Sequence, residues 1–518
     1  MNTANNQPTH ERAELQTARK ALTLIHNLLA GPERMWEEST QYIRKWKDED
    51  HATYEIRRKA EPLFGGLKRT LLAAKGMLHA KPMGVEWNES ETVLGPLFDD
   101  IDNSGTNLET FCQHFSFAAL RDGLAVLVVD FPTPPEGVPV TAANERQLGL
   151  RPYFTLYNRM EAVSWREAKV NGKRMIVQLT LRETASVPDG EFGVATVERY
   201  RDWRMDGLDT IAPYATWRLW EASNKGNHAT EYVVTESGIV RNRVGETLPE
   251  LPIAIAYTGM KTAALVVDPP LDGVAYANLA EWRYATNLAF NRELCGFEQL
   301  VITGRIAKDP TTPTMPGGIK VGPAVFIHLD EGSTAQWIAP GGGGNAQLEK
   351  GRAEKIEEMN TLGLGFLIPD ASVQKTATEA HIDSYAMTAS LAASGIAISD
   401  ALNKGAELLA WYEGIEKESA PVITIQTDFD SKEMDSNTML AYGKLVEAGF
   451  PKLQVLMQMQ KGKRITADAD LEELMAEWDG ELAAQAAEAD AQREAALATA
   501  AASEPHANDN AVAPEPMP

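Results

Sequence analysis

The sequence contains the residue types that do chemistry, but their spacing matches none of the common catalytic or metal-binding motifs. None of the nine histidines belongs to an HExxH pair, and Cys112 and Cys295 lie outside any CxxC. A GxxxxGKS/T phosphate loop and a GxSxG nucleophile elbow are both missing from the sequence. We therefore predict a protein with no catalytic residues, no metal site and no bound cofactor.

Three weaker features could still bind a ligand. Asp428 and Asp430 resemble the first two positions of a calcium loop, but the glycine and the terminal glutamate of such a loop do not follow. The acidic run at 468–473 is explained equally well as the first turn of a helix, where carboxylates are favourable. The glycines at 341–344 lack the lysine of a phosphate-binding loop and indicate a hinge. In each case the ordinary structural interpretation is favoured.

The charge balance is the most unusual property of the composition. The 518 residues include 73 Asp and Glu against 49 Lys and Arg, a formal net charge of -24. Such a surface repels polyphosphates and anionic lipids, so a basic face that reads nucleic acid and a membrane-docking face are both disfavoured. With 44% hydrophobic residues the chain can still bury a core. Any nucleic acid partner must therefore be handled without strong adhesion.

No segment of the sequence indicates secretion or a membrane span. The N-terminal residues are polar and lack the basic and apolar regions of a signal peptide. No stretch reaches the roughly 18–20 apolar residues that cross a bilayer. The two distant cysteines do not suggest a disulfide framework. We expect a protein of the cytosol in the cell that makes it.

The N-terminal part of the chain predicts helices. Apolar residues at helical spacing favour helices at 11–29, 55–78 and 108–121. The second of these includes Ile56 in its apolar stripe, and Pro62 interrupts or starts it.

A β-rich unit follows these helices. Residues 123–132 form a short apolar run that ends at a proline, which is typical of a buried strand. Seven short segments rich in β-branched and aromatic residues come next, between 151 and 257. Trp203, Trp217 and Trp220 lie in these segments and are expected to be core residues or cross-strand pairs.

The second half of the chain returns to the helical period, with one interruption. A long helix is predicted at 272–297, short strands among prolines and glycines at 298–344, and a second helix at 345–362. The pattern breaks at 363–375 and resumes in a very long Ala-rich helix at 376–412.

The long Ala-rich helix contains Gly395 and Gly405, which are candidate kink points. One strand follows it, and from Ser436 the chain is predicted to be helical and acidic, with one helix starting at Pro451. The last residues, 504–518, have no apolar period and are expected to be disordered.

This order of elements, together with several stretches of sequence, resembles the portal proteins of tailed bacteriophages. The stretches are RDGLAVLVVDFP, RPYFTLYNRMEAVSWRE, PPLDGVAYANLAEWRYATNLAF, IKVGPAVFIHLDEGSTAQWIAPGG followed by EKIEEMNTLGLGFL, and TATEAHIDSYAMTASLAASGIAISDALNKGAELLAWYEG. Together they span roughly residues 15–475. No single motif is diagnostic, and the joint order of the pieces carries the resemblance.

The resemblance implies an α+β class and the phage portal fold, with an α/β wing, long stem helices, a small β-rich clip, a long spine helix and a helical crown. Its parts fall on this chain as the wing at 1–271, the stem helices at 272–297 and 345–362, the clip at 298–344, the tunnel loop at 363–375, the spine helix with its return strand at 376–435, the crown at 436–503 and the disordered tail at 504–518.

The resemblance also points to two sets of residues. The tunnel loop would narrow a channel with mostly apolar side chains and a polar tip: Leu364, Phe366, Leu367, Ile368, Gln374 and Lys375. The stem carries mixed charges that could pair between neighbouring subunits, or could simply form a solvated helix face: Glu281, Arg283, Arg292 and Glu293.

Portals of this kind form a twelve-subunit ring at one capsid vertex, and the resemblance implies this location and function here. Double-stranded DNA would pass through the ring during packaging and ejection, without sequence specificity. A separate terminase would supply the ATP-driven motor and dock on the clip, and head-tail adaptor or tail proteins would later replace it. The other implied partner is the major capsid protein, with no membrane involved. The ring would assemble in the host cytoplasm and reside in the virion.

Two alternatives from other classes remain open at the level of sequence. One is a cytosolic multi-domain hydrolase whose acidic cleft is assembled from carboxylates far apart in the chain. The other is a soluble interaction scaffold outside any virus.

For a channel that conducts DNA, the net charge of -24 is favourable. Each Lys or Arg that binds a phosphate adds affinity and would hold the duplex in the channel.

Overall fold

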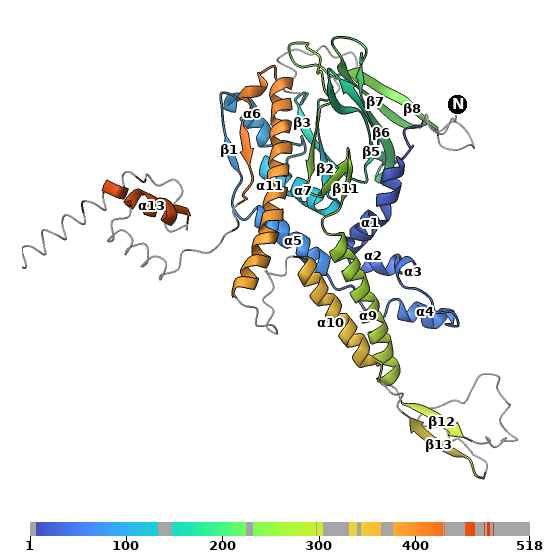
Figure 1. Ribbon diagram of the computed structural model, residues 1–518. Helices are drawn as coiled ribbons and strands as arrows, with labels where there is room; N and C mark the ends of the chain where they lie inside the picture. The colour runs from blue at the N-terminus through green and yellow to red at the C-terminus, as the bar shows by residue number, and fades with distance from the viewer. Residues whose placement is uncertain are drawn as a thin grey trace, which may run out of the picture. The chain divides into compact units, whose positions relative to one another are not determined.

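The computed structural model describes residues 7–132, 148–223, 231–296, 298–303, 331–338, 343–363, 377–427, 429, 451–461 and a few positions between 471 and 480 (Figure 1). The chain divides into two units, residues 1–429 and 430–518. In the second unit the described helix is α13 (Lys452–Lys461), which begins directly after Pro451 as predicted. All other elements belong to the first unit.

The N-terminal part is helical. Its elements are α1 (Ala13–Ala30), α2 (Pro32–Glu37), α3 (Ser39–Tyr42), α4 (His51–Arg57), α5 (Gly66–Leu78), the short strand β1 (Gly84–Glu86) and α6 (Glu91–Phe98). Over the helical stretch predicted at 55–78 the chain forms two helices, and the interruption predicted at Pro62 is confirmed by the break between α4 and α5. Ile56 was expected on the apolar stripe and is instead 57% exposed at the end of α4.

A three-stranded antiparallel sheet forms the centre of the main core. Its order is β3 (Tyr153–Asn158), β2 (Leu124–Asp130) and β9 (Ile253–Tyr257), and every residue of the middle strand is buried. The buried strand predicted from the apolar run is therefore confirmed. Helix α7 (Leu108–Asp122) packs on β2 and ends at Gly123, whose φ of 81° suits a residue without a side chain.

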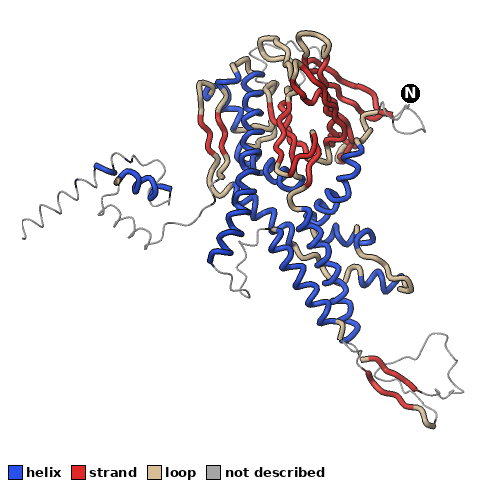
Figure 2. Tube along the Cα trace, in the orientation of Figure 1, coloured by secondary structure: helices blue, strands red, loops and turns tan. Residues whose placement is uncertain are grey.

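The second large sheet is a five-stranded meander, seen among the red strands of Figure 2. Its strands are β4 (Ala162–Val170), β5 (Lys173–Asp189), β6 (Gly193–Asp206), β7 (Tyr214–Ser223) and β8 (Glu231–Ile239), each antiparallel to the next. Asn171 and Gly172 have φ values of 49° and 82°, which is the geometry of a tight hairpin turn. Trp203 lies opposite Trp217, as the cross-strand interpretation predicted.

The remaining described elements follow in chain order. They are the hairpin β10 (Met260–Ala263) with β11 (Val266–Asp268), helix α9 (Asp272–Gly296), the hairpin β12 (Gln299–Thr303) with β13 (Thr334–Ile338), helix α10 (Asn345–Leu362), helix α11 (Ala377–Tyr412), the 3-10 turn η3 (Lys417–Ser419) and β14 (Val422–Thr424), which pairs with β1. The mixed α and β class predicted from the sequence is confirmed.

Helix α11 packs on the three-stranded sheet along strands β2 and β9. The close approach occurs at Gly405, where an added Cβ would lie 2.6 Å from a methyl group of Leu127 and 2.9 Å from the ring of Phe154. Gly405 was predicted as a candidate kink point. The contacts give it a different role, because only a residue without a side chain lets the helix lie this near the sheet.

This close approach predicts an unequal effect of two glycine substitutions. Gly405→Ala should lower the free energy of unfolding by about 1–3 kcal/mol, because the methyl group overpacks the core. Gly76→Ala is the control, since Gly76 lies in α5 with no atom within 4 Å of an added Cβ. It should be neutral or stabilise by about 0.5–1 kcal/mol. Urea unfolding of both variants measures the difference, and equal effects would contradict the packing argument.

Candidate functional site

Helices α9 and α10 form an antiparallel pair. Gly273 lies near the start of α9, and a Cβ added to it would be 3.3 Å from Cδ1 of Leu362 at the end of α10. At the other end Arg292 donates to the carboxylate of Glu349. Between them the ring of Tyr284 would lie 2.9 Å from a Cβ at Gly351, so glycine is needed for the helices to approach. These contacts run along nearly all of α10, and the chain between the two helices carries the β12–β13 hairpin.

The first half of α9 is held in the body by buried polar groups. The Asn278 side chain accepts a hydrogen bond from the backbone N–H of Leu67 at 2.9 Å and donates to the carbonyl of Phe64 at 2.8 Å. It thereby satisfies a free N–H in the first turn of α5. Trp282 is fully buried, and its indole N–H donates to the carbonyl of Glu61 at 3.0 Å. The base of α9 is therefore fixed in position and in rotation.

Glu281 pairs with α10 within the same chain. Its Oε1 accepts a hydrogen bond from Nε of Arg352 at 2.6 Å, and the residue is fully buried. Burial raises the pKa of Glu281, and the hydrogen bond from Arg352 opposes that rise. The pair joins the two helices at the middle of their contact.

The other predicted stem residues lie at the surface of α9. Arg283 is exposed and donates to the backbone carbonyl of Tyr42 at 2.8 Å. Arg292 is exposed and reaches Glu349 on α10. Glu293 is exposed and has no ion pair among the residues that the structure describes. Pairing of these charges between subunits stays a prediction, with Glu281 already bound inside its own chain.

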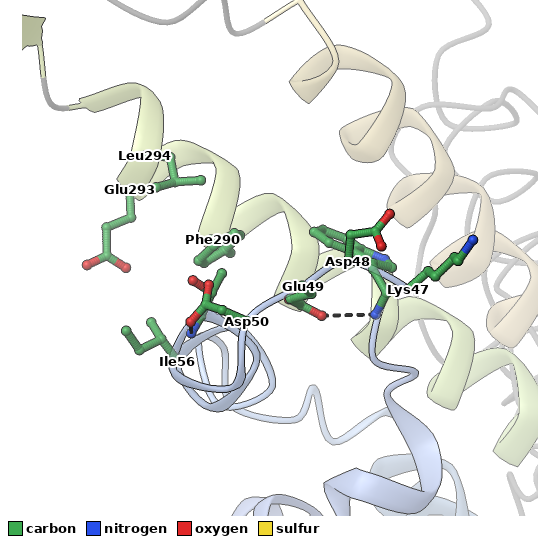
Figure 3. Close-up of a pocket in the computed structure, with 10 residues that line it drawn as sticks. Lys47, Asp48, Glu49, Asp50, Ile56, Phe290, Glu293 and Leu294 are labelled. Carbon is green, nitrogen blue, oxygen red and sulfur yellow. Dashed lines mark hydrogen bonds between the residues drawn. The ribbon is translucent and has the colours of Figure 1, made fainter.

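A hollow of about 770 Å³ opens beside the far end of α9 (Figure 3). Its apolar wall comes from Trp46, Ile56, Phe290 and Leu294, and its other lining residues are Lys47, Asp48, Glu49, Asp50, Thr53 and Glu293. Figure 3 shows Phe290, Glu293 and Leu294 on the α9 helix, across from the residues of the segment that leads into α4. Trp46 and Ile56 are at least half exposed, although they are large apolar side chains.

The segment that leads into α4 is fixed by a buried ion pair. Arg57 donates from Nε and Nη2 to the two oxygens of Glu49 at 2.7 and 2.8 Å, and both side chains are 2% exposed. Nη1 of Arg57 also donates to the side-chain oxygen of Asn287 on α9 at 3.1 Å. The guanidinium lies 4.0 Å from the centre of the Trp46 ring, a cation–π contact. One arginine therefore connects the hollow's two walls.

Sequence reasoning missed the hollow and its ion pair. Glu49 and Arg57 are eight residues apart and belong to no motif, and Asn287 is more than two hundred residues away. The one available signal was the cluster of charges around Trp46 in WKDED, which is unusual next to an aromatic residue.

The predicted tunnel-loop residues, 364–375, lie outside the described residues, as do Asp428, Asp430 and most of 468–473. In the described part of the chain no three His, Cys, Asp or Glu side chains come together to hold a metal ion. No described helix has the length and apolarity of a membrane span. Cys112 is buried, and burial raises the pKa of its thiol to about 12, which keeps it protonated.

A protein-family model covers this pair of helices and its continuation. Residues 270–413 match the family model of a domain of unknown function, DUF4055, which runs from just before α9 to just after α11. No protein with a curated description matches the chain.

Among solved structures the chain is similar to components of gene transfer agent particles. A chain in the virion of the native particle is 12% identical, over 80% of this chain and 95% of that one, with a TM-score of 0.36. A chain in the neck of the empty particle, computed with C6 symmetry, is 12% identical over 79% and 93%, with a TM-score of 0.35. A third, in the neck of the native particle computed with C12 symmetry, is 11% identical over 81% and 99%, with a TM-score of 0.33.

The buried ion pair predicts a pH-dependent stability. Glu49→Gln should lower the free energy of unfolding by about 3 kcal/mol at neutral pH, because Arg57 is left buried without its counter-charge. The hydrogen bonds from Arg57 lower the pKa of Glu49 below its ordinary value of 4.5. The stabilisation is therefore present above pH 4.5 and is lost as the pH falls below that value toward the folded-state pKa.

Unfolding of wild type and variant across pH 3–7 measures this effect. Glu37→Gln is the matched control, because Glu37 pairs with Arg34 at the surface, where the side chains are 47% and 67% exposed. Its effect should stay below about 0.5 kcal/mol. A Glu49→Gln variant as stable as the Glu37→Gln variant would show that the buried pair does not anchor this segment.

Proposed function

We propose that this chain is a portal protein of a tailed bacteriophage or a phage-like particle. About twelve copies would form a ring at one capsid vertex, through which double-stranded DNA is packaged and ejected. The sequence resemblance supports this proposal, together with the order of α9, a β hairpin, α10 and α11 in the structure.

The observation that carries the proposal is the exposure of the α9–α10 pair. Of the eighteen residues of α10, all of them described, Met359 alone is buried. Ile356 also packs on the cluster around Trp282, but most of the helix contacts only α9 and solvent, and the last residues of α9 beyond Phe290 are exposed or half-buried. Most helices in proteins owe their stability to packing. The exposed faces of α9 and α10 are therefore well suited to pack against the equivalent helices of neighbouring copies.

A ring that only conducts DNA would need no catalytic site of its own. The force for DNA movement would come from a separate terminase, whose large subunit docks transiently, and head-tail adaptor or tail proteins would take its place. The β12–β13 hairpin is the natural docking element, because β13 is exposed along its whole length and includes Trp337, which is 55% exposed. The major capsid protein would surround the ring.

The ring is the first prediction of this proposal. The purified full-length chain should form a closed assembly near twelve copies of its 56.7 kDa mass. Mass photometry gives the copy number, and negative-stain images should show rings with a central opening. A chain that stays monomeric at micromolar concentration in both measurements would contradict the proposed function.

The second prediction concerns the predicted tunnel loop. Removal of residues 364–372 should leave ring assembly intact but reduce DNA packaging or retention, because the segment would no longer narrow the channel. The measurement is nuclease-protected DNA per particle in a packaging assay that uses the variant as its only source of this chain. Removal of 225–229, between β7 and β8, is the control and should change neither property. Normal packaging in the 364–372 deletion would argue against the tunnel assignment.

A further inference from the structure

The hollow beside α9 is an apolar surface with an acidic rim. Trp46, Ile56 and Leu294 are between 46% and 57% exposed there, which is a large apolar area for three neighbouring side chains. The rim carries the carboxylates Asp48, Asp50 and Glu293 against one cation, Lys47, and neither Asp48 nor Glu293 has an ion pair among the described residues. A surface of this kind fits a partner that is apolar at its centre and basic around it.

One described face of the same chain has the complementary character. The outward side of α5 carries Lys68, Arg69 and Leu72, and Phe64 lies just before the helix. Leu72 is 46% exposed and Phe64 is 38% exposed. The two cations have no ion pair among the residues that the structure describes. This face is named the α5 face below.

The hollow and the α5 face lie on different sides of the α9–α10 pair. Phe290 comes nine residues after Glu281 on α9, which is half a turn away from the side that contacts α10. Helix α5 is on the α10 side, because Gly66 lies against the Met359 sulfur and Thr70 lies against Gly363. Figure 1 shows α10 and α5 to one side of α9 and α4 to the other.

A ring requires this arrangement. In a cyclic assembly each subunit contacts its neighbours through two different patches, which must be complementary and must lie on different sides of the subunit. A two-fold dimer would instead place one patch against itself. The acidic rim would repel its own copy, so the hollow is poorly suited to a symmetric dimer.

We infer that the hollow formed by Trp46, Ile56, Phe290 and Leu294 receives the α5 face of the next copy of this chain. Leu72 and Phe64 would cover the apolar wall, and Lys68 and Arg69 would pair with Asp48 and Glu293. This inference rests on the proposed function, because it describes the contact that closes the ring.

The test is a charge exchange between the two surfaces. The hollow variant combines Asp48→Lys with Glu293→Lys, and the α5 variant combines Lys68→Glu with Arg69→Glu. Each alone places like charges at every interface of the ring and should lower the ring fraction about tenfold or more. An equimolar mixture should restore rings, because both contacts between alternating subunits are then attractive, and a single chain with all four changes should also assemble.

The matched control reverses two cations elsewhere. Lys169→Glu with Lys173→Glu changes the exposed ends of β4 and β5, and it should leave the ring fraction unchanged. Neutral variants supply a second measurement that does not depend on reversed charge. The ring formed by Asp48→Asn with Glu293→Gln should dissociate at a lower salt concentration than the wild-type ring, because fewer ion pairs remain.

The outcomes separate this inference from the function on which it rests. Loss of rings in each variant and recovery in the mixture would support the contact. Normal assembly of both variants, or a loss that neither the mixture nor the combined variant repairs, would overturn it while the wild-type ring stands. A wild-type chain that forms no ring would overturn the proposed function itself.

Discussion

The arrangement of helices α9 and α10 depends on the burial of one side chain, Trp282. The cluster around this indole contains residues from α1, α2, α4, α5, α9 and α10, together with Ile43 of the segment before α4. It is separate from the main core, which is built on the three-stranded sheet. Because Trp282 and Asn278 are fixed by hydrogen bonds to the chain around α5, the rotation of α9 about its axis is set at its base. Because the helix is regular, this rotation also sets the direction of each side chain farther along α9.

This rotation decides which side chains of α9 face α10 and which face the hollow. Glu281 and Tyr284 meet α10, whereas Phe290 and Leu294 line the hollow on the other side. Glu281 is fully buried on the α10 side, whereas Glu293 is exposed near the hollow. The buried polar groups at the base cost little in stability because they are hydrogen-bonded, and their partners fix this rotation of α9.

Most elements could be predicted from the sequence because their signals are local. The seven β segments between 151 and 257, the buried strand at 124–130 and the helix that ends at Gly123 all follow from periodicity and turn residues within a few positions. The bounds of α9 and α10 follow in the same way. At 55–78 Pro62 indicated the interruption, but the apolar spacing continued across it and did not show that the break runs from 58 to 65. Spacing alone does not show that Ile56 faces solvent.

The candidate site was less predictable because its contacts are between residues far apart in sequence. Arg57 with Asn287 and Asn278 with Leu67 are ordinary polar residues that no short pattern distinguishes. Gly405 was noticed, but as a kink point, since the side chains that it accommodates, Leu127 and Phe154, are on strands. In each case the missing information is the tertiary partner, which sets the role of the residue.

If the hollow receives the α5 face, assembly also changes how many cations of the chain are accessible to DNA. The two surfaces together bring acids and bases into contact, so the net charge of -24 per chain is unchanged by assembly. The number of accessible cations falls, however, because Lys68 and Arg69 would be neutralised at each interface. Phosphates bind to accessible Lys and Arg by releasing counterions. Assembly would therefore leave the ring less adhesive to DNA than the same chains are when separate, and the pairing of these cations would add to the repulsion by its excess carboxylates.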